Sequence, residues 1–272
     1  DCTLEPASGS HRGHALRLGF REIKGFPETA AARIVAARGG GYQSIAELYR
    51  RAGLSKAVLD RLARADACRS IEFLRRQAAW DIRALDDAPL PLFAGLGGDG
   101  ESLHPATLES TIRLPVMSMG EQVVEDYATL RMSLRCHPLY LLRPELEARG
   151  VVPCTQLACL TPEQQVTVAG LVLSRQRPGT AKGVIFMTLE DETGIANLVV
   201  WADVFERFRR TVVGARLLVC TGRLQREGLV IHIIARHLED YSQHLDGLVD
   251  LGREAEPAAP PTRLAISSRN FH

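Results

Sequence analysis

Five short apolar runs between Val166 and Ala235 constrain the fold of this chain more than any other feature. The runs are rich in Val, Ile and Leu, and glycine-containing turns bound four of them: VTVAGLVLS, GVIFMTLE, IANLVVW, ARLLVCTGRL and LVIHIIA. Runs of this length and composition between turn residues are typical of β-strands. The sequence therefore predicts five strands in the second half of the chain.

One helix is expected among these strands. Between the third and fourth runs, Val204, Phe208 and Val212 recur every four residues and can form one apolar helical stripe. Three strands, a helix and two strands is the order of an OB fold, a small barrel that binds oligonucleotides on strands two and three and their flanking loops. A barrel used only for packing is the alternative.

The first part of the chain predicts a helix-hairpin-helix. A short helix is expected through Leu16, Phe20 and Ile23, followed by a turn over 24–27 and a second helix over 30–38. In such hairpins, backbone N–H groups at the start of the second helix can hold a DNA phosphate. A merely structural turn is the equal alternative, because Pro27 replaces a usual glycine and has no N–H.

A second helical unit follows. Ser44 starts a capping-box pattern, Gly53 ends that helix, and Ser55 is the predicted N-cap of the next. A further helix is expected over 73–85, with Trp80 in the core.

The helical region is also the basic part of the chain. Residues 11–85 contain 15 Lys and Arg against 7 Asp and Glu, whereas residues 86–165 contain 5 against 11. Such a distribution suits a polyanion-binding unit, although a solvated basic surface explains it equally well. The candidates for contact with duplex DNA are Lys24, Gly25, Phe26, Lys56, Arg61 and Arg64.

The predicted barrel carries candidates for contact with single-stranded DNA. Three cations lie on or beside the loop between the first two strands, where they could follow a nucleic-acid backbone. The two aromatic candidates could stack on bases or pack in the core, and alternation alone does not fix their side of the barrel. The candidates are Arg175, Arg177, Lys182, Phe186, Trp201 and Arg223.

No residue pattern predicts a catalytic or metal site. The acidic run 190–192 precedes Thr193 and Gly194, so it is interpreted as a hairpin connection, and His137 as a turn or core histidine. Cys154 and Cys159 have no second pair of zinc ligands. No apolar run approaches the roughly 20 residues of a membrane span. We expect reduced thiols and a cytoplasmic location.

Residues 86–119 are rich in Pro and Gly and predict a linker. Within it, the apolar peptide containing Leu90, Leu92 and Phe93 could dock into a hydrophobic groove of a partner. The predicted fold class is therefore α+β and multidomain. The expected parts are 1–12 as a disordered or fragment end, 13–85 as helix-hairpin-helix domain, 86–119 as linker, 120–160 as connecting helices, 161–240 as OB fold and 241–272 as tail.

Several stretches resemble a known family. RLGFREIKGF, AGLSKAVLDRLARADACRS, EDYATLRMSLRCHPLYLLRP, RQRPGTAKGVIFMTLEDETG and SSRNFH are similar to the C-terminal part of bacterial error-prone DNA polymerases, the second alpha-subunit type of the C-family replicases. The resemblance implies that the helical front holds duplex DNA behind the active site, and that the barrel binds single-stranded template.

The resemblance also implies the activity of a parent enzyme. That family performs template-directed nucleotidyl transfer with two Mg²⁺ ions held by palm aspartates, and no residue here matches those aspartates. We therefore expect this chain to bind DNA without catalysing synthesis itself, and to need no cofactor of its own.

The apolar peptide has a counterpart in replicative relatives, where a clamp-binding peptide usually opens with Gln and ends in Leu-Phe. Leu92 and Phe93 match the end of that motif, but the Gln is missing. A sliding clamp and an accessory mutasome protein are thus both candidate partners. The alternative function is a scaffold that recruits such partners and binds little DNA.

Overall fold

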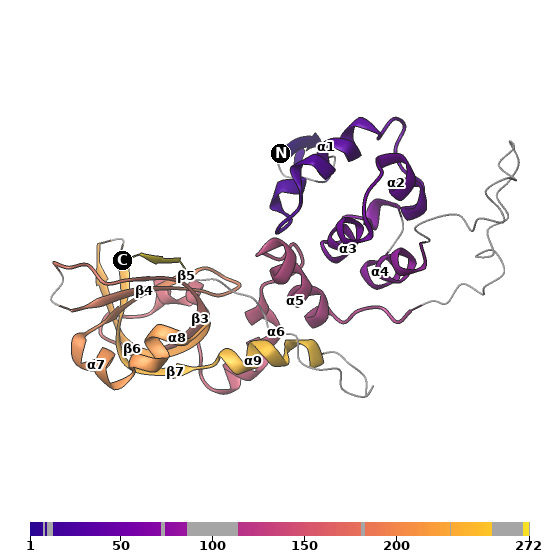
Figure 1. Cartoon of the computed structure of the whole chain (residues 1–272). Helices are drawn as coiled ribbons and strands as arrows, with labels where there is room; N and C mark the ends of the chain where they lie inside the picture. Colours follow the sequence, from indigo (N-terminus) through magenta and orange to yellow (C-terminus); the bar gives the residue numbers. More distant parts are fainter. Residues whose placement is uncertain are drawn as a thin grey trace, which may run out of the picture. The chain divides into compact units, whose positions relative to one another are not determined.

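The computed structural model describes residues 1–7, 9, 13–71, 74–85, 114–180, 183–228, 230–251 and 269–271. They form two compact units, Asp1–Met117 and Ser118–His272 (Figure 1). Each unit has its own core and is described by itself.

The first unit is mainly helical. Its elements in chain order are β1 (Thr3–Pro6), β2 (His14–Arg17), the 3-10 helix η1 (Phe20–Glu22), α1 (Glu28–Ala36), α2 (Ile45–Ala52), α3 (Lys56–Arg64), η2 (Arg69–Ile71) and α4 (Arg75–Ala84). The core includes apolar side chains from each α-helix, among them Ile34, Leu48, Leu59, Leu62 and Ile82.

The first predicted helix differs from the structure. Leu16 lies in β2 and is exposed, because β2 pairs with β1 in antiparallel register and directs its backbone hydrogen bonds to that strand. Only Phe20–Glu22 forms a single 3-10 turn, which Gly19 precedes in extended conformation. The hairpin therefore joins a 3-10 turn to α1, and β1 lies within the stretch expected to lack regular structure.

The other helices follow the sequence pattern more closely. The Ser44 hydroxyl accepts a hydrogen bond from the N–H of Glu47, and Gly53 ends α2 in the left-handed conformation. Ser55 precedes α3, but its side chain makes no capping hydrogen bond. The placement of Trp80 in the core was wrong. Its side chain is 46% exposed because α4 buries the opposite face, which carries Ala78 and Ile82.

The second unit combines helices with a barrel. Its elements are α5 (Met119–Leu130), α6 (Pro138–Ala148), η4 (Cys154–Cys159), β3 (Gln165–Gln176), β4 (Ile185–Glu190), β5 (Ile195–Val200), α7 (Ala202–Arg207), α8 (Arg209–Gly214), β6 (Leu217–Glu227), β7 (Val230–Asp240), α9 (Ser242–Asp246), η5 (Gly247–Asp250) and β8 (Arg269–Phe271).

The five predicted strands form a closed barrel, which confirms the OB-type architecture. The strand order is β4-β5-β7-β6-β3, and β3 pairs back with β4. Only β5 and β7 pair in parallel within this ring, and β8 adds a short parallel strand beside the end of β3. The interior is filled by fully buried side chains from every strand, among them Val168, Leu189, Leu198, Leu218 and Ile233.

A second core attaches helices to the outside of this barrel. The outward side of β3 and β6 carries Leu171, Leu217 and Val219, which would otherwise face water. Leu139 and Leu146 of α6 cover them, together with residues of α5 and α9. The helices expected as a connector therefore share a core with the barrel. The predicted cap of α5 is confirmed as a complete capping box between Ser118 and Glu121.

Candidate nucleic-acid interface

Two rows of side chains cross the outer surface of the barrel. Cross-strand neighbours in a sheet point to the same face, and Met187, Leu198 and Ile233 between the rows point into the core. The first row follows the register as Gln176, Phe186, Val199, Ile234 and Arg223. The second row follows it as Ser174, Thr188, Asn197, His232 and Gln225.

The second row consists entirely of polar side chains that are partly exposed. Hydroxyl, amide and imidazole groups both donate and accept hydrogen bonds, as the edges of nucleobases do. Thr188 and Asn197 interact with each other, with 3.3 Å between Oγ1 and Oδ1. This row can therefore form hydrogen bonds with a ligand. Because it carries no carboxylate, it does not repel a ligand that is negatively charged.

Aromatic side chains flank the rows at one end of the barrel. Phe186 belongs to the first row and is 38% exposed, so its ring lies on the outer face. Trp201 follows β5 as the N-cap of α7 and is 51% exposed. Both rings are accessible for stacking on a planar ligand.

Two of the three cations predicted on or beside the first inter-strand loop lie in different environments. Arg177 is exposed, and its guanidinium carbon lies 5.3 Å from the centroid of the Phe205 ring. Arg175 lies within β3, and its Nε donates to the carbonyl of Val212 at 2.6 Å while Nη2 donates to the carbonyl of Ala215. Burial lowers the pKa of the Arg175 guanidinium. Arg175 thus caps the C-terminal end of α8.

The remaining predicted barrel contacts are not all available. Arg223 stands in the first row but forms an ion pair with Glu163. Lys182 lies outside the described residues, as do Leu90, Leu92 and Phe93 of the apolar peptide. Phe186, Trp201 and Arg177 are therefore the predicted residues that the structure brings to one end of the outer face.

In the first unit, the predicted hairpin turn is exposed at its tip. Lys24 and Gly25 are exposed, and Gly25 has a φ of 68°, which a side chain would strain. Phe26 stacks on Phe20 with 5.5 Å between ring centroids. The guanidinium of Arg61 donates to the carbonyl of Gly25, so this residue ties α3 to the turn.

The other two candidates of this region already interact within the chain. Lys56 is partly buried and Arg64 is exposed, and each has a partner. Among the described residues, the N–H groups of Glu28 and Thr29 at the start of α1 have no acceptor. These two donors lie at the positive end of the helix dipole.

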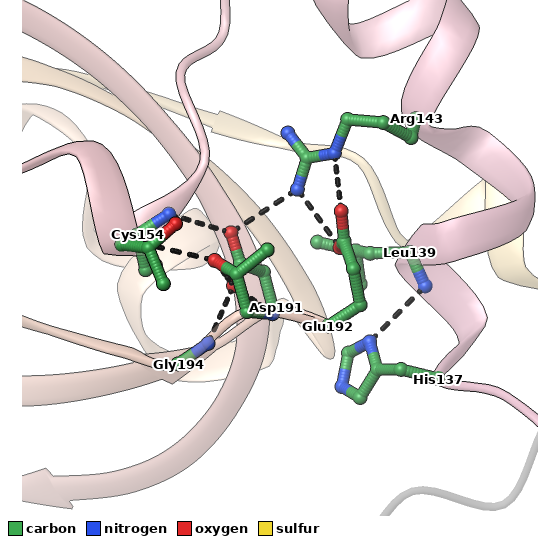
Figure 2. A network of polar contacts seen from close by, with 9 residues as sticks. His137, Leu139, Arg143, Cys154, Asp191, Glu192 and Gly194 are labelled. Atoms are coloured by element: carbon green, nitrogen blue, oxygen red, sulfur yellow. Dashed lines mark hydrogen bonds and ion pairs between the residues drawn. The ribbon is translucent and has the colours of Figure 1, made fainter.

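A buried polar network fixes the turn between β4 and β5 (Figure 2). Asp191 has a fully buried side chain, and its Oδ1 accepts hydrogen bonds from Thr193 N, Thr193 Oγ1 and Gly194 N. Its Oδ2 accepts from Cys154 N at 2.8 Å and from Arg143 Nη2 at 3.1 Å. Burial by itself raises the pKa of Asp191, but the hydrogen bonds from Thr193 and Cys154 outweigh it and hold that pKa below its usual value.

This network connects the turn to α6. Arg143 of α6 reaches Asp191 and also donates from Nε to Glu192 at 2.5 Å (Figure 2). His137 caps the start of α6, where its Nδ1 accepts from the N–H of Leu139. The acidic run therefore belongs to a hairpin, as interpreted from the sequence. Arg143 was not predicted, because no local sequence pattern links it to a turn 48 residues further along the chain.

The described residues contain neither a metal-binding cluster nor a membrane-spanning helix. No three His, Cys, Asp or Glu side chains in the ranges given above are grouped so that they could hold a metal ion. No helix in those ranges combines the length and apolar character that crossing a bilayer requires.

Comparison with known proteins finds a matching family model in each unit of the chain. Residues 1–78 match the family described as a helix-hairpin-helix motif, and residues 166–241 match the family described as an OB-fold nucleic acid binding domain. The two matches occur in the order expected for the C-terminal region of the polymerase family resembled by the sequence.

Curated relatives extend the similarity to nearly the whole chain. An error-prone DNA polymerase of Ruegeria pomeroyi is 53% identical over 91% of this chain, and error-prone DNA polymerase 1 of Rhizobium meliloti is 50% identical over 89%. Error-prone DNA polymerase 2 of Agrobacterium fabrum is 46% identical over 92%. The chain spans only 22%, 21% and 23% of these relatives' lengths. About nine-tenths of this chain is thus homologous to one segment of the error-prone DNA polymerases. That segment makes up between a fifth and a quarter of the length of those relatives.

Proposed function

We propose that this chain is the DNA-binding segment of an error-prone DNA polymerase, and that the outer face of the barrel binds the single-stranded template. The observation that carries the proposal is the second row of polar side chains on β3, β4, β5, β7 and β6, bordered by the exposed ring of Phe186. The homology to error-prone polymerases supports DNA as the ligand.

The chemistry of this face suits a strand whose bases are unpaired. Unpaired bases present donors, acceptors and a π-face, which polar side chains and an aromatic ring can contact without selecting one sequence. Template binding by a polymerase needs such tolerance. Arg177 stands beside the face and can contact phosphate, so we expect binding to weaken as salt increases.

The hairpin of the first unit is proposed to contact duplex DNA. The free N–H groups of Glu28 and Thr29, and the exposed turn at Lys24 and Gly25, can approach a phosphate without reading bases. Pro27 offers no N–H, so the contact would use the two residues that follow it.

The proposed parent activity is template-directed DNA synthesis across damaged template in the bacterial cytoplasm. In the family that the sequence resembles, two Mg²⁺ ions supply the chemistry of this activity. The described residues do not fit such a metal pair, so we assign the ions to other parts of the parent enzyme. In this proposal the chain holds and orients DNA while bond formation occurs elsewhere.

The test is fluorescence anisotropy of the 272-residue chain with a labelled primer-template that carries a single-stranded overhang. Phe186→Ala should weaken binding by about tenfold or more, since base stacking on an aromatic side chain contributes about 1–3 kcal/mol. Tyr140→Ala is the matched control, because Tyr140 is an exposed aromatic residue on α6, off the barrel. A folded chain that does not bind DNA at low salt would refute the proposal, as would equal affinities of the two variants.

A further inference from the structure

Four exposed arginines lie at the end of the barrel where Phe186 and Trp201 are found. Arg207, Arg209 and Arg210 come from α7 and α8, and Arg177 follows β3. We call these four residues the arginine patch. Three of them lie outside the strands and loops with which an OB fold usually binds oligonucleotides.

A single buried ring organises two members of the patch. Phe205 is 5% exposed and belongs to the barrel core. The guanidinium carbons of Arg177 and Arg209 lie 5.3 Å and 5.5 Å from the centroid of this ring. Cation–π contacts therefore hold two like charges near one another on the surface. Such an arrangement favours a ligand with repeated negative charge.

The patch is only weakly neutralised by its neighbours. Asp203 is 4.0 Å from Arg207, and Glu206 is 3.8 Å from Arg209, and all four side chains are more than half exposed. Exposed pairs at such distances contribute little, so a phosphate can displace the carboxylates. Arg210 makes no ion pair with any residue in the described part of the chain.

The chain connects the patch directly to the candidate interface. Arg177 immediately follows Gln176, the end of the first row, and α7 begins directly after Trp201 at the end of β5. A strand lying along the outer face would meet the patch where it leaves β4 and β5. The patch is thus placed to contact phosphates beyond the nucleotides that contact the two rows.

We propose that the arginine patch binds backbone phosphates of the single strand as it leaves the outer face, and so lengthens the binding site over α7 and α8. This inference rests on the proposed function of the barrel. It adds Arg207, Arg209 and Arg210 to the binding residues and predicts that their contribution depends on the length of the strand.

The test compares oligothymidylates of about four and about sixteen nucleotides, the usual limits of site size for one OB fold. Affinities of the full 272-residue chain are measured by anisotropy at several salt concentrations. Arg209→Gln with Arg210→Gln should weaken binding of the long oligonucleotide by roughly tenfold at about 0.1 M salt. A plot of log affinity against log salt has a negative slope, and this slope should become less steep by about 1.4. Each phosphate contact to a single strand contributes about 0.7 to the steepness. Binding of the short oligonucleotide should change by less than about twofold, because it does not reach the patch.

Two further variants keep the outcome interpretable. Arg131→Gln removes one exposed charge at the end of α5 and should leave both affinities unchanged. Arg210→Gln alone removes no described contact, so it decides the question if the double variant fails to fold. Its plot of log affinity against log salt should be less steep than that of the wild type by about 0.7.

The failures of the two proposals are distinguishable. If the folded wild-type chain binds neither oligonucleotide, the proposed function fails and this inference with it. If the wild type binds both, but the double variant binds the long oligonucleotide normally or loses affinity equally for both lengths, only the arginine patch is refuted.

Discussion

Replacement of Asp191 by Asn should destabilise the barrel unit by about 3 kcal/mol. The two carboxylate oxygens accept hydrogen bonds from five donors, three at Oδ1 and two at Oδ2. An amide has one oxygen and one NH₂ group. If the amide oxygen stays towards Thr193 and Gly194, the NH₂ group meets the N–H of Cys154 and the guanidinium of Arg143, which are both donors.

The magnitude follows from the groups left without an acceptor. A buried N–H without a partner costs about 1–3 kcal/mol, and here that group is the N–H of Cys154. Breaking a buried ion pair costs about 3–5 kcal/mol, but Arg143 retains Glu192, so only part of this applies. Turning the amide over would leave the N–H groups of Thr193 and Gly194 without an acceptor, because only the Thr193 hydroxyl can accept from the NH₂ group, and so would not reduce the loss.

Urea unfolding followed by tryptophan fluorescence measures this change. The chain has two tryptophans, one in each unit, so a Trp80→Phe background leaves Trp201 to report on the barrel unit alone. Linear extrapolation then gives the free energy of unfolding. Glu163→Gln is the control, since it removes an exposed ion pair with Arg223 that should contribute less than about 1 kcal/mol. A loss for Asp191→Asn no larger than that of the control would refute the argument.

Two further predictions concern an arginine pair and a histidine. Arg175→Ala should lower the melting temperature, because the carbonyls of Val212 and Ala215 lose their donor and the free energy of unfolding falls by about 1–3 kcal/mol. Arg177→Ala should mainly weaken DNA binding. Equal loss of DNA affinity in both variants would contradict this. Burial lowers the pKa of His137 to about 4, so the unfolded chain binds the extra proton and stability falls as pH drops from about 6.5 to 4. His137→Asn keeps a capping acceptor but does not titrate. Urea unfolding at pH 7 and at pH 4.5 should show that the drop in the free energy of unfolding between these pH values is about 2 kcal/mol smaller in the variant. An unchanged pH dependence would count against this assignment.

The barrel was predictable because its signal is strong in every strand. Each strand combines a continuous or alternating apolar run with a turn, and the helical stripe of Val204, Phe208 and Val212 lies between the expected strands. The β1–β2 hairpin left no such signal, since its residues are almost all exposed and carry no apolar alternation. The pairing of two exposed segments depends on their backbone hydrogen bonds and on the turn that connects them. The residue types in the two segments do not reveal this pairing.

The candidate site was harder to predict because it depends on one inserted residue. In β3, Val172 pairs with Leu189 but Ser174 pairs with Thr188, so Leu173 is an extra residue in the strand. A bulge reverses the alternation that follows it, and no residue type marks it in the sequence.

The bulge decides what the arginines after it can do. Ser174 is turned to the outer face, and Arg175 to the side of its buried neighbour Met187, from which its guanidinium reaches the end of α8. Arg177 lies just beyond the end of β3 and meets Phe205 of α7. Without the extra residue, alternation would put Arg175 on the outer face beside the polar row. Arg175, a candidate DNA contact from the sequence, therefore caps α8 in the structure, and Arg177 belongs to the patch proposed to contact the departing strand.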